Sequence, residues 1–497
     1  MPASTDTAFR TPPRWGSQCL RGVCCLAAFL WGASSPATPQ VPTSALGPDA
    51  IRKIDALIAI AMSHQHVPAV SVAIAKNGSI LYARGYGYRD LTNRRPANAD
   101  TIYNIGSVTK QFTAAAILLL QQEGKLSVND SLGKYFPAYP YAKKLTLRNL
   151  LNQTSGIPDY VYLPNLPHHA TAMGFFKMVW VPLHFSPGTR FEYSSTNYLV
   201  LGMIVEMVSG DSYGGFLAKH LFEPLGMNDS STRVEPRELS NGAIGYTFDG
   251  RRIAYKTATP DDIGYGDATV NSSAPDLIRW DVALESGGVV DAASWKAMIS
   301  PPVARYEPPY GGYGFGLFVG RLYDRQMIYH PGANPGFITY NATFPGDGLE
   351  IAILGNSDNF QTQPLFKRIF ELVEPLTAAQ IRDEERPAPN ENVKVRALAK
   401  RWLARLQTGD IDRSQLSTEG AKVLTPAYAR ALVSNARAIG TPQSFVYRGV
   451  SYTNRKLFYA YILRFSHATV FYYVVLTKGG RIRDLDLQRE DPALARR

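Results

Sequence analysis

A serine and a lysine three residues apart stand at the start of a long apolar stretch with helical periodicity. The tetrapeptide Ser107-Val108-Thr109-Lys110 leads into the run from Phe112 to Leu120, where apolar residues recur at helical spacing. Residues three apart share one face of a helix, so the Ser107 hydroxyl and the Lys110 amine can point into the same cleft. The pattern predicts a buried helix that presents a serine and a basic partner at its N-terminal end.

This pairing has a chemical meaning. A serine hydroxyl becomes a nucleophile only when a neighbour takes its proton, and a lysine can do so if burial or nearby positive charge lowers its pKa. The positive end of the helix macrodipole lies near Lys110, Asn104 can cap the helix, and Gly106 removes side-chain bulk beside the serine. Serine–lysine pairs are a known variant of nucleophilic catalysis.

Two other serine motifs are rejected. Ser131 and Lys134 repeat the spacing, but their tetrapeptide contains a glycine, precedes a proline-containing segment and opens no apolar helix. Ser212 lies in a Gly-x-Ser-x-Gly sequence, which would need a preceding strand to form a nucleophile elbow. The residues Asn197 to Val208 instead show a helix pattern that ends at Gly210, so Ser212 is predicted to cap a helix.

Further motifs follow Ser107 in a fixed order. With them the chain resembles the class C beta-lactamase-like serine hydrolases, which include D-alanyl-D-alanine carboxypeptidases, family VIII esterases and D-aminopeptidases. The resemblance covers roughly residues 50–375, and order plus number make it specific. The matching stretches are Leu145–Pro158, Phe185–Gly188, Tyr193–Ser195, Glu223–Met227, Tyr313–Leu317 and His330–Gly332.

The resemblance implies a role for each matched residue. Ser107 would be the acylated nucleophile, Lys110 its immediate partner and Tyr193 the group that accepts and donates protons. His330 stands where many relatives have lysine. A tyrosine can act as a base at neutral pH only if a close cation such as Lys110 favours its ionised form. Whether Tyr193 or Lys110 takes the first proton stays open.

The same resemblance places three residues at the substrate. The backbone amides of Ser107 and Ala333 would form the oxyanion hole. Gly332 would lie with His330 on a strand edge along the cleft, where a glycine lets the substrate backbone approach closely. Ser195 would take the third position of the Tyr193 motif.

The chain also departs from the family pattern. Ser195 replaces the usual asparagine, so an amide that could bridge the lysine and a substrate carbonyl becomes a shorter hydroxyl. Pro331 has no N–H to donate, but leaves Ala333 free to do so. Gln153 stands where a histidine is common, and we interpret it as packing behind the site. Ester hydrolysis tolerates such changes best.

The resemblance implies an exported serine hydrolase that acts through an acyl-enzyme. Its substrate would be an ester or a D-amino-acid-containing amide or peptide, and weak beta-lactamase activity is a further expectation. The alternative is a catalytically silent relative that binds cell-envelope peptides or partners. Ser195 favours that alternative slightly, whereas the presence of Ser107, Lys110 and Tyr193 argues against it.

Residues 1–37 have the pattern of a secretory signal peptide, with arginines, then the apolar run from Gly22 to Gly32, then small residues. About eleven apolar residues are fewer than the roughly 20 that span a membrane. All three cysteines, Cys19, Cys24 and Cys25, fall in this segment, so the mature protein would have no thiol chemistry. We therefore expect a periplasmic or secreted protein.

The hydrolase domain is predicted to span residues 38–385 and to have an α+β fold of the beta-lactamase/transpeptidase type, an antiparallel sheet sandwiched by helices. A Lys-Asn-Gly turn signal at residues 76–78 joins two of its strands. The other histidines lack acidic or cysteine partners at metal spacing, so no metal site and no cofactor are predicted. The expected elements are a helix at 51–62 and strands at 69–75, 80–87, 327–329, 337–344 and 349–354.

A proline-containing break at 386–390 introduces a C-terminal region of different charge. Residues 386–497 carry 20 Lys and Arg against 8 Asp and Glu, whereas the preceding 385 residues carry 32 against 33. This region is predicted to be a small α+β domain, with a faint resemblance to NTF2-like modules. Its basic surface could contact anionic cell-envelope polymers or a membrane surface, against the alternative of a solvated surface; nucleic acid is not expected as a partner. The expected elements are helices at 395–406 and 426–440 and strands at 444–452, 456–466, 468–478 and 481–487.

Overall fold

The structure is a computed structural model that describes residues 46–162, 182–232, 236–256, 265–302, 311–380, 386–388, 390–453, 456–466 and 468–489. The predicted signal peptide, residues 1–37, and all three cysteines lie outside these ranges. Within them, no helix combines the length and the apolar character that crossing a membrane requires.

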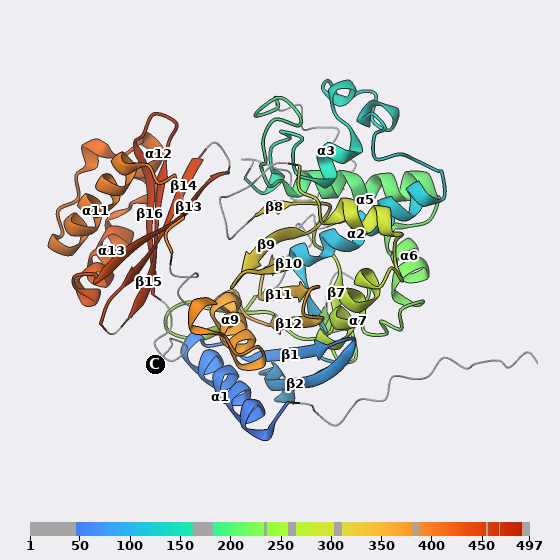
Figure 1. The fold of residues 1–497 in the computed structure, drawn as a ribbon, viewed down its shortest axis with the longest axis horizontal. Coiled ribbons are helices and arrows are strands. Elements are labelled where there is room, and N and C mark those ends of the chain that lie inside the picture. Colours follow the sequence, from blue (N-terminus) through green and yellow to red (C-terminus); the bar gives the residue numbers. More distant parts are fainter. Residues whose placement is uncertain are drawn as a thin grey trace, which may run out of the picture. The chain divides into compact units, whose positions relative to one another are not determined.

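An eight-stranded antiparallel sheet forms the centre of the hydrolase region (Figure 1). Its strand order is β3-β2-β1-β12-β11-β10-β9-β8, so early and late strands combine in one sheet, as predicted. The β1–β2 turn places Asn77 at φ 51° and Gly78 at φ 76°, the left-handed conformations that a tight hairpin turn requires. The strands are β1 Ala69–Lys76, β2 Ser79–Asp90, β3 Arg95–Pro96, β8 Gly312–Tyr313, β9 Phe318–Leu322, β10 Arg325–Asn334, β11 Phe337–Phe344 and β12 Leu349–Gly355.

Helices cover both faces of this sheet. On β11, Tyr340 and Phe344 contact the aromatic rings of α9, Thr362–Val373. Asn341 donates a hydrogen bond to α7, Ala274–Glu285, on the other side. Because successive side chains of a strand point to opposite faces, α7 and α9 lie on opposite faces of the sheet. The sandwich is therefore confirmed.

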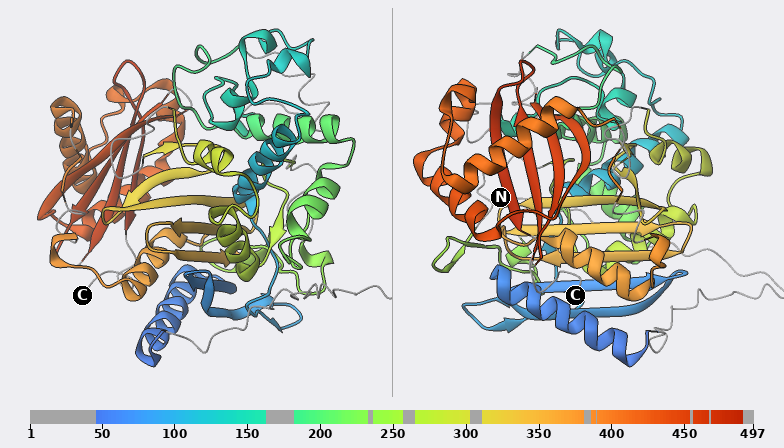
Figure 2. Two further views of the ribbon diagram at one scale, coloured as in Figure 1. Left: turned by 45° about the vertical axis from the view of Figure 1, so that its right-hand side comes forward. Right: turned by 60° about the vertical axis from the view of Figure 1, so that its left-hand side comes forward.

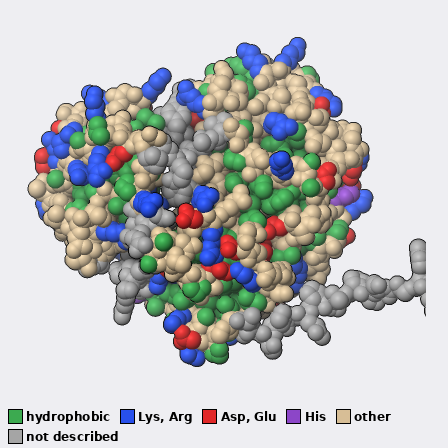
Figure 3. Space-filling view, in the orientation of Figure 1, with side chains coloured by type: hydrophobic (Ala, Val, Ile, Leu, Met, Phe, Trp, Pro, Cys, Tyr) green, Lys and Arg blue, Asp and Glu red, His purple; other side chains and the backbone are tan. Residues whose placement is uncertain are grey.

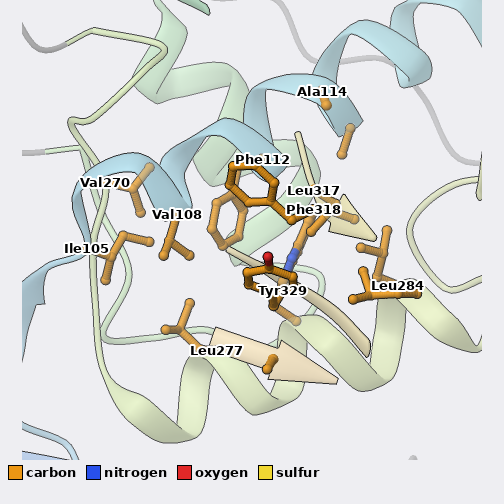
Figure 4. Close-up of a cluster of buried hydrophobic side chains, with 14 of the residues drawn as sticks. Ile105, Val108, Phe112, Ala114, Val270, Leu277, Leu284, Leu317, Phe318 and Tyr329 are labelled. Atoms are coloured by element: carbon orange, nitrogen blue, oxygen red, sulfur yellow. The ribbon is translucent and has the colours of Figure 1, made fainter. Parts of the chain in front are cut away.

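The long helix α1, Pro48–Gln65, lies beside α9 and contains the predicted helix at 51–62 (Figures 1 and 2). Helix α7 supports α2, Thr109–Gln122, because Phe112 of α2 packs on Trp280 of α7 with ring centroids 4.2 Å apart. Figure 4 shows Phe112 among the side chains of this buried cluster, which links the helix that follows Ser107 to the sheet.

The remaining elements of the hydrolase region are short, apart from one long helix, α5. Two-stranded sheets join β4 to β7 and β5 to β6. These elements are α3 Leu147–Leu151, α5 Ser195–Ser209, α6 Tyr213–Leu217, α8 Ala292–Met298, β4 Tyr103–Asn104, β5 Tyr246–Phe248, β6 Ile253–Tyr255 and β7 Asn271–Ser272.

The C-terminal region has a four-stranded antiparallel sheet in the order β13-β14-β15-β16. Trp402, Leu432 and Tyr472 belong to its hydrophobic core, which shares no residue with the core of the hydrolase region among the residues described. The short helix α12 was not predicted. Ala388 of the predicted linker is buried, and its N–H bonds to the Tyr447 carbonyl at 2.9 Å. The elements are α11 Val393–Thr408, α12 Thr418–Val423, α13 Pro426–Ile439, β13 Ser444–Thr453, β14 Lys456–Arg464, β15 Thr469–Leu476 and β16 Ile482–Arg489.

Candidate active site

Ser107 and Lys110 meet directly. Ser107 lies in a 3₁₀ turn, Gly106–Val108, that leads into α2, and Lys110 is the second residue of that helix. The Lys110 Nζ donates to the Ser107 Oγ at 2.9 Å, as the helical spacing predicted. Ser107 remains partly exposed, whereas Lys110 is fully buried. The hydroxyl can therefore meet a substrate while its basic partner is shielded from water.

Lys110 has a second polar partner and two aromatic neighbours. Its Nζ donates to the backbone carbonyl of Asp267 at 3.0 Å. It also lies 5.0 Å from the ring centroid of Tyr193 and 5.9 Å from that of Tyr198. Cations are attracted to the faces of aromatic rings at such distances, so these contacts fix the position of the amine.

Tyr193 lies between Lys110 and a group of aromatic side chains on β8, β9 and β10. It precedes α5, and its ring stacks on Phe318 of β9 with centroids 6.1 Å apart. The ring also meets Tyr313 edge-on at 5.9 Å and lies 6.1 Å from the ring of His330. Lys110 therefore lies against the face of this ring.

His330 is buried on β10, and its two nitrogens have partners. Its Nδ1 lies 2.7 Å from the Pro331 carbonyl oxygen, which can only accept, so we assign the proton to Nδ1. The Nε2 then accepts from the Tyr313 hydroxyl at 3.1 Å. His330 therefore joins the site through Tyr313. Burial raises the pKa of Tyr313 and of Tyr198 well above the usual tyrosine range, so both stay protonated donors.

The backbone around Ala333 faces the nucleophile. Asn334 and Phe337 flank a two-residue turn and form a hydrogen-bonded pair, so Ala333 occupies a non-hydrogen-bonded position and its N–H points away from β11. Gly106 has φ 53°, and a Cβ there would lie 2.6 Å from the Ala333 nitrogen. Glycine at 106 thus permits the close approach that an oxyanion hole built from Ser107 and Ala333 needs.

The same alternation explains Pro331. It also occupies a non-hydrogen-bonded position opposite β11, and β9 pairs with β10 only as far as Tyr329. The missing N–H therefore costs no ladder bond. Gly332 also meets a packing constraint, because a Cβ there would lie 2.0 Å from the Ile105 carbonyl oxygen. Packing between β10 and the segment before Ser107 is sufficient to require glycine at this position.

Ser195 is the first residue of α5, which begins two residues earlier than the predicted helix. Gln153 is buried with φ 60°, and its side-chain oxygen accepts from the Ser194 N–H at 3.0 Å and from the Asn197 amide at 2.6 Å. Gln153 thus holds the segment between Tyr193 and α5, which agrees with its interpretation as packing behind the site.

The two rejected serines have structural roles. Ser131 caps a 3₁₀ turn, and Lys134 is largely exposed and pairs with Asp130 at 2.7 Å. Ser212 caps α6 by accepting from the Gly215 N–H. Neither serine therefore has the lysine contact found at Ser107.

Several residues of the site were not predicted. Tyr313 begins the family motif Tyr313–Leu317, and Asp159 and Tyr160 directly follow the motif Leu145–Pro158. Their proximity to these motifs could have indicated that they belong to the site. Asp267 had none, because it reaches Lys110 through its backbone carbonyl. Burial is the main cause that raises the pKa of Asp267 and raises that of Asp159 to about 6, with Lys110 lowering both.

Comparison with known proteins gives a consistent picture. A family model described as Beta-lactamase matches residues 54–373. The chain is 29% identical over 377 residues to Penicillin-binding protein 4* of Bacillus subtilis (strain 168), which covers 71% of this chain and 82% of that protein. It is 29% identical over 335 residues to Protein flp of Staphylococcus aureus (strain MRSA252), covering 62% of this chain and 63% of that protein.

Solved structures show the same fold. An octameric penicillin-binding protein homologue from Pyrococcus abyssi superposes with a TM-score of 0.62 at 24% identity, covering 88% of this chain and 98% of that one. The D-amino acid amidase from Ochrobactrum anthropi SV3, in complex with L-phenylalanine amide, superposes with a TM-score of 0.58 at 25% identity, covering 65% of this chain and 98% of that one.

Proposed function

The chain belongs to the Beta-lactamase family and is a serine hydrolase, and on that premise we propose that it acts through a covalent acyl-enzyme formed on Ser107. The observation that carries the proposal is the 2.9 Å contact between the Lys110 amine and the Ser107 hydroxyl. A nucleophile and a basic partner within hydrogen-bond distance are what an activated serine requires.

The proposed reaction has two halves. The Ser107 oxygen attacks the substrate carbonyl carbon and loses its proton either to Lys110 or to Tyr193. The backbone N–H groups of Ser107 and Ala333 stabilise the oxyanion of the tetrahedral intermediate. The alcohol or amine leaves with a proton from the same groups, and a water molecule then attacks the acyl-enzyme and releases the acid.

We propose an ester or a D-amino-acid-containing amide as the substrate class. The similarity to a D-amino acid amidase supports the amide. Ser195 supports the ester, since its hydroxyl is shorter than the asparagine side chain usual there and offers less to an amide carbonyl. Hydrolysis of p-nitrophenyl butyrate and of the p-nitroanilides of D- and L-phenylalanine would separate these substrates; we expect the ester to react fastest and the D-anilide faster than the L-anilide.

Pre-steady-state hydrolysis of p-nitrophenyl butyrate tests the acyl-enzyme. We expect a burst of p-nitrophenol followed by steady turnover, and a loss of roughly 10³-fold or more in Ser107→Ala. Ser131→Ala is the matched control, because it removes the serine of the rejected Ser-x-x-Lys sequence and should keep full activity. Equal rates in Ser107→Ala and the unaltered protein would contradict the proposal.

A fluorophosphonate probe tests the alternative of a silent binding protein. We expect the probe to add its mass to the peptide that contains Ser107 and to leave Ser131 unmodified. If Ser107 stays unlabelled and no ester is turned over, a binding protein for cell-envelope peptides becomes the better account of this site.

Export is part of the same proposal. It rests on the basic and apolar pattern of residues 1–37. Mass spectrometry of the protein made in a bacterial host should find a mature N-terminus close to residue 38. A full-length cytoplasmic product that begins at Met1 would exclude this segment as a cleaved signal.

A further inference from the structure

The segment Pro158–Tyr160 is hydrogen-bonded to the first turn of α5. The Tyr160 N–H donates to the Thr196 hydroxyl oxygen at 2.9 Å, and that hydroxyl donates to the Pro158 carbonyl at 2.8 Å. Thr196 is fully buried, so water does not compete for these bonds. The segment is thus fixed to the helix whose start carries Ser195.

Asp159 lies at the N-terminal end of α5. Ser194 occupies the N-cap position, but its side chain makes no capping bond. The Asp159 carboxylate accepts from the Val161 N–H at 3.2 Å, and the backbone N–H of Ser195 lies close enough to lower its pKa. A carboxylate at a helix N-terminus pairs with unsatisfied N–H groups and with the positive end of the macrodipole.

Tyr160 connects this segment to Lys110. Its hydroxyl donates to the Asp267 carboxylate at 2.9 Å, and the backbone carbonyl of Asp267 accepts from the Lys110 amine at 3.0 Å. Asp159 therefore lies at the start of α5, the helix that follows Tyr193. Its neighbour Tyr160 binds Asp267, whose backbone carbonyl accepts from Lys110.

We propose that Asp159 and Tyr160 are positioning residues for the hydrolase reaction: Asp159 fixes the start of α5 and with it Tyr193, and Tyr160 fixes the Asp267 carbonyl that orients Lys110. The inference rests on the proposed function. It assigns no contact with substrate to either residue; both act through the groups that they hold.

The ionised form of Asp159 is the form that fixes the start of α5. A protonated carboxyl is a weaker acceptor for the Ser195 N–H and carries no charge to complement the macrodipole. The charged groups that act on Asp159 are Lys110 of α2, which lowers its pKa, and Asp267, which raises it; burial outweighs both and brings the pKa to about 6. Positioning should therefore weaken as the pH falls below about 6.

The pH dependence of kcat for p-nitrophenyl butyrate tests the inference, with product followed at the isosbestic wavelength of p-nitrophenol. The unaltered protein should lose about tenfold in kcat between pH 7 and pH 5, as one group of this pKa requires. Asp159→Asn should lower kcat at pH 8 by about 10-fold to 100-fold with little change in KM, and should abolish the fall between pH 7 and pH 5.

Asp276→Asn is the matched control. Asp276 is buried, lies in the first turn of α7 and has a pKa raised by burial to about 6, but its bonds go to Asp229, Ser230 and Arg279, away from the site. This variant should keep the unaltered pH profile of kcat. The role of Asp159 would be overturned if kcat of Asp159→Asn still fell between pH 7 and pH 5. It would also be overturned if Asp276→Asn lost this fall in kcat as well.

Tyr160→Phe provides an independent measurement should Asp159→Asn not fold. Loss of the hydroxyl alone should lower kcat about tenfold at every pH with KM unchanged. A kcat equal to that of the unaltered protein would overturn the inference for Tyr160. Failure of the unaltered protein to hydrolyse any substrate would instead count against the proposed function, so the two failures are distinguishable.

Discussion

Lys110 determines whether Ser107 can react, because its amine is the group in direct contact with the hydroxyl. Lys110→Met keeps the length and the apolar stem of the side chain but removes the proton acceptor and the bond to the Asp267 carbonyl. We expect kcat for p-nitrophenyl butyrate to fall by about 10²-fold to 10⁴-fold, the range for loss of a general base.

Lys134→Met is the control for this change, because Lys134 belongs to the rejected Ser-x-x-Lys sequence and pairs with Asp130 on the surface. It should leave kcat unaltered. A Lys110→Met protein that is folded by circular dichroism and retains more than about a tenth of the activity would show that Lys110 is not the base.

His330 should matter less than its position in the family motif implies. Both ring nitrogens have partners, the Pro331 carbonyl and the Tyr313 hydroxyl, so proton transfer with substrate would first break one of these bonds. We expect His330→Phe to lower kcat by less than about tenfold, mainly through the lost Tyr313 bond. A loss as large as that of Lys110→Met, measured in the same assay, would assign His330 a direct catalytic role.

At the scale of elements, α7 packs on the sheet through polar as well as apolar side chains. Asp281 and Glu285 of α7 face Asn341 and Thr343 of β11, and Glu350 lies next to them on β12. Burial raises the pKa of Glu285 to about 7 and that of Glu350 to about 8. Both groups are thus protonated in the folded protein at a pH where they ionise in the unfolded chain.

This difference makes stability depend on pH. Between the ordinary value of 4.5 and the folded value of about 8, the folded protein holds a proton on Glu350 that the unfolded chain has lost, so stability falls as the pH rises. One such group contributes a slope of about 1.4 kcal/mol per pH unit. Glu350→Gln should flatten the slope of the unfolding free energy between pH 5 and pH 8 and stabilise the protein at pH 8.

Denaturant unfolding at several pH values measures this effect. Glu238→Gln is the control, because Glu238 is exposed and its replacement should leave the slope unchanged. An identical slope in Glu350→Gln and the unaltered protein would mean that Glu350 is ionised in the folded state.

Helix α5 shows where prediction at this scale stops. Its apolar periodicity is local, and its C-terminal end at Gly210 was predicted correctly. Its N-terminal end was predicted two residues late, and the segment bonded to it, Pro158–Tyr160, lies more than thirty residues upstream. Contacts with a distant segment leave no signal in the residues next to the helix.

At the scale of the whole molecule, the C-terminal region carries all of the positive net charge, since the preceding residues are one negative charge from neutral. The full chain has a formal net charge of +11, and residues 386–497 contribute 20 Lys and Arg against 8 Asp and Glu. In Figure 3 the Lys and Arg side chains visible on the part that carries α11 to α13 are spread among neutral ones. We propose that this region is a domain of its own, as its separate core suggests.

Sedimentation with anionic and neutral vesicles tests whether that charge has a partner. The protein from residue 46 onward should bind vesicles rich in phosphatidylglycerol at about 0.05 M salt and release them at about 0.5 M, since screening weakens such contacts. A protein of residues 46–385 should fail to bind but keep its kcat for p-nitrophenyl butyrate. Equal binding by both proteins would assign the contact to the hydrolase region, and no binding by either would leave a solvated surface.

The sequence by itself determined the features that depend on neighbours along the chain. These are the hairpin at Asn77 and Gly78, the positions of the sheet's main strands, and the helix that brings Lys110 to Ser107, because turn chemistry and periodicity act over a few residues. Only the tertiary structure decided what surrounds the pair. The Asp267 carbonyl reaches Lys110 across 157 residues of sequence, and the Tyr160 hydroxyl reaches Asp267 across 107, so packing of the whole fold sets these contacts.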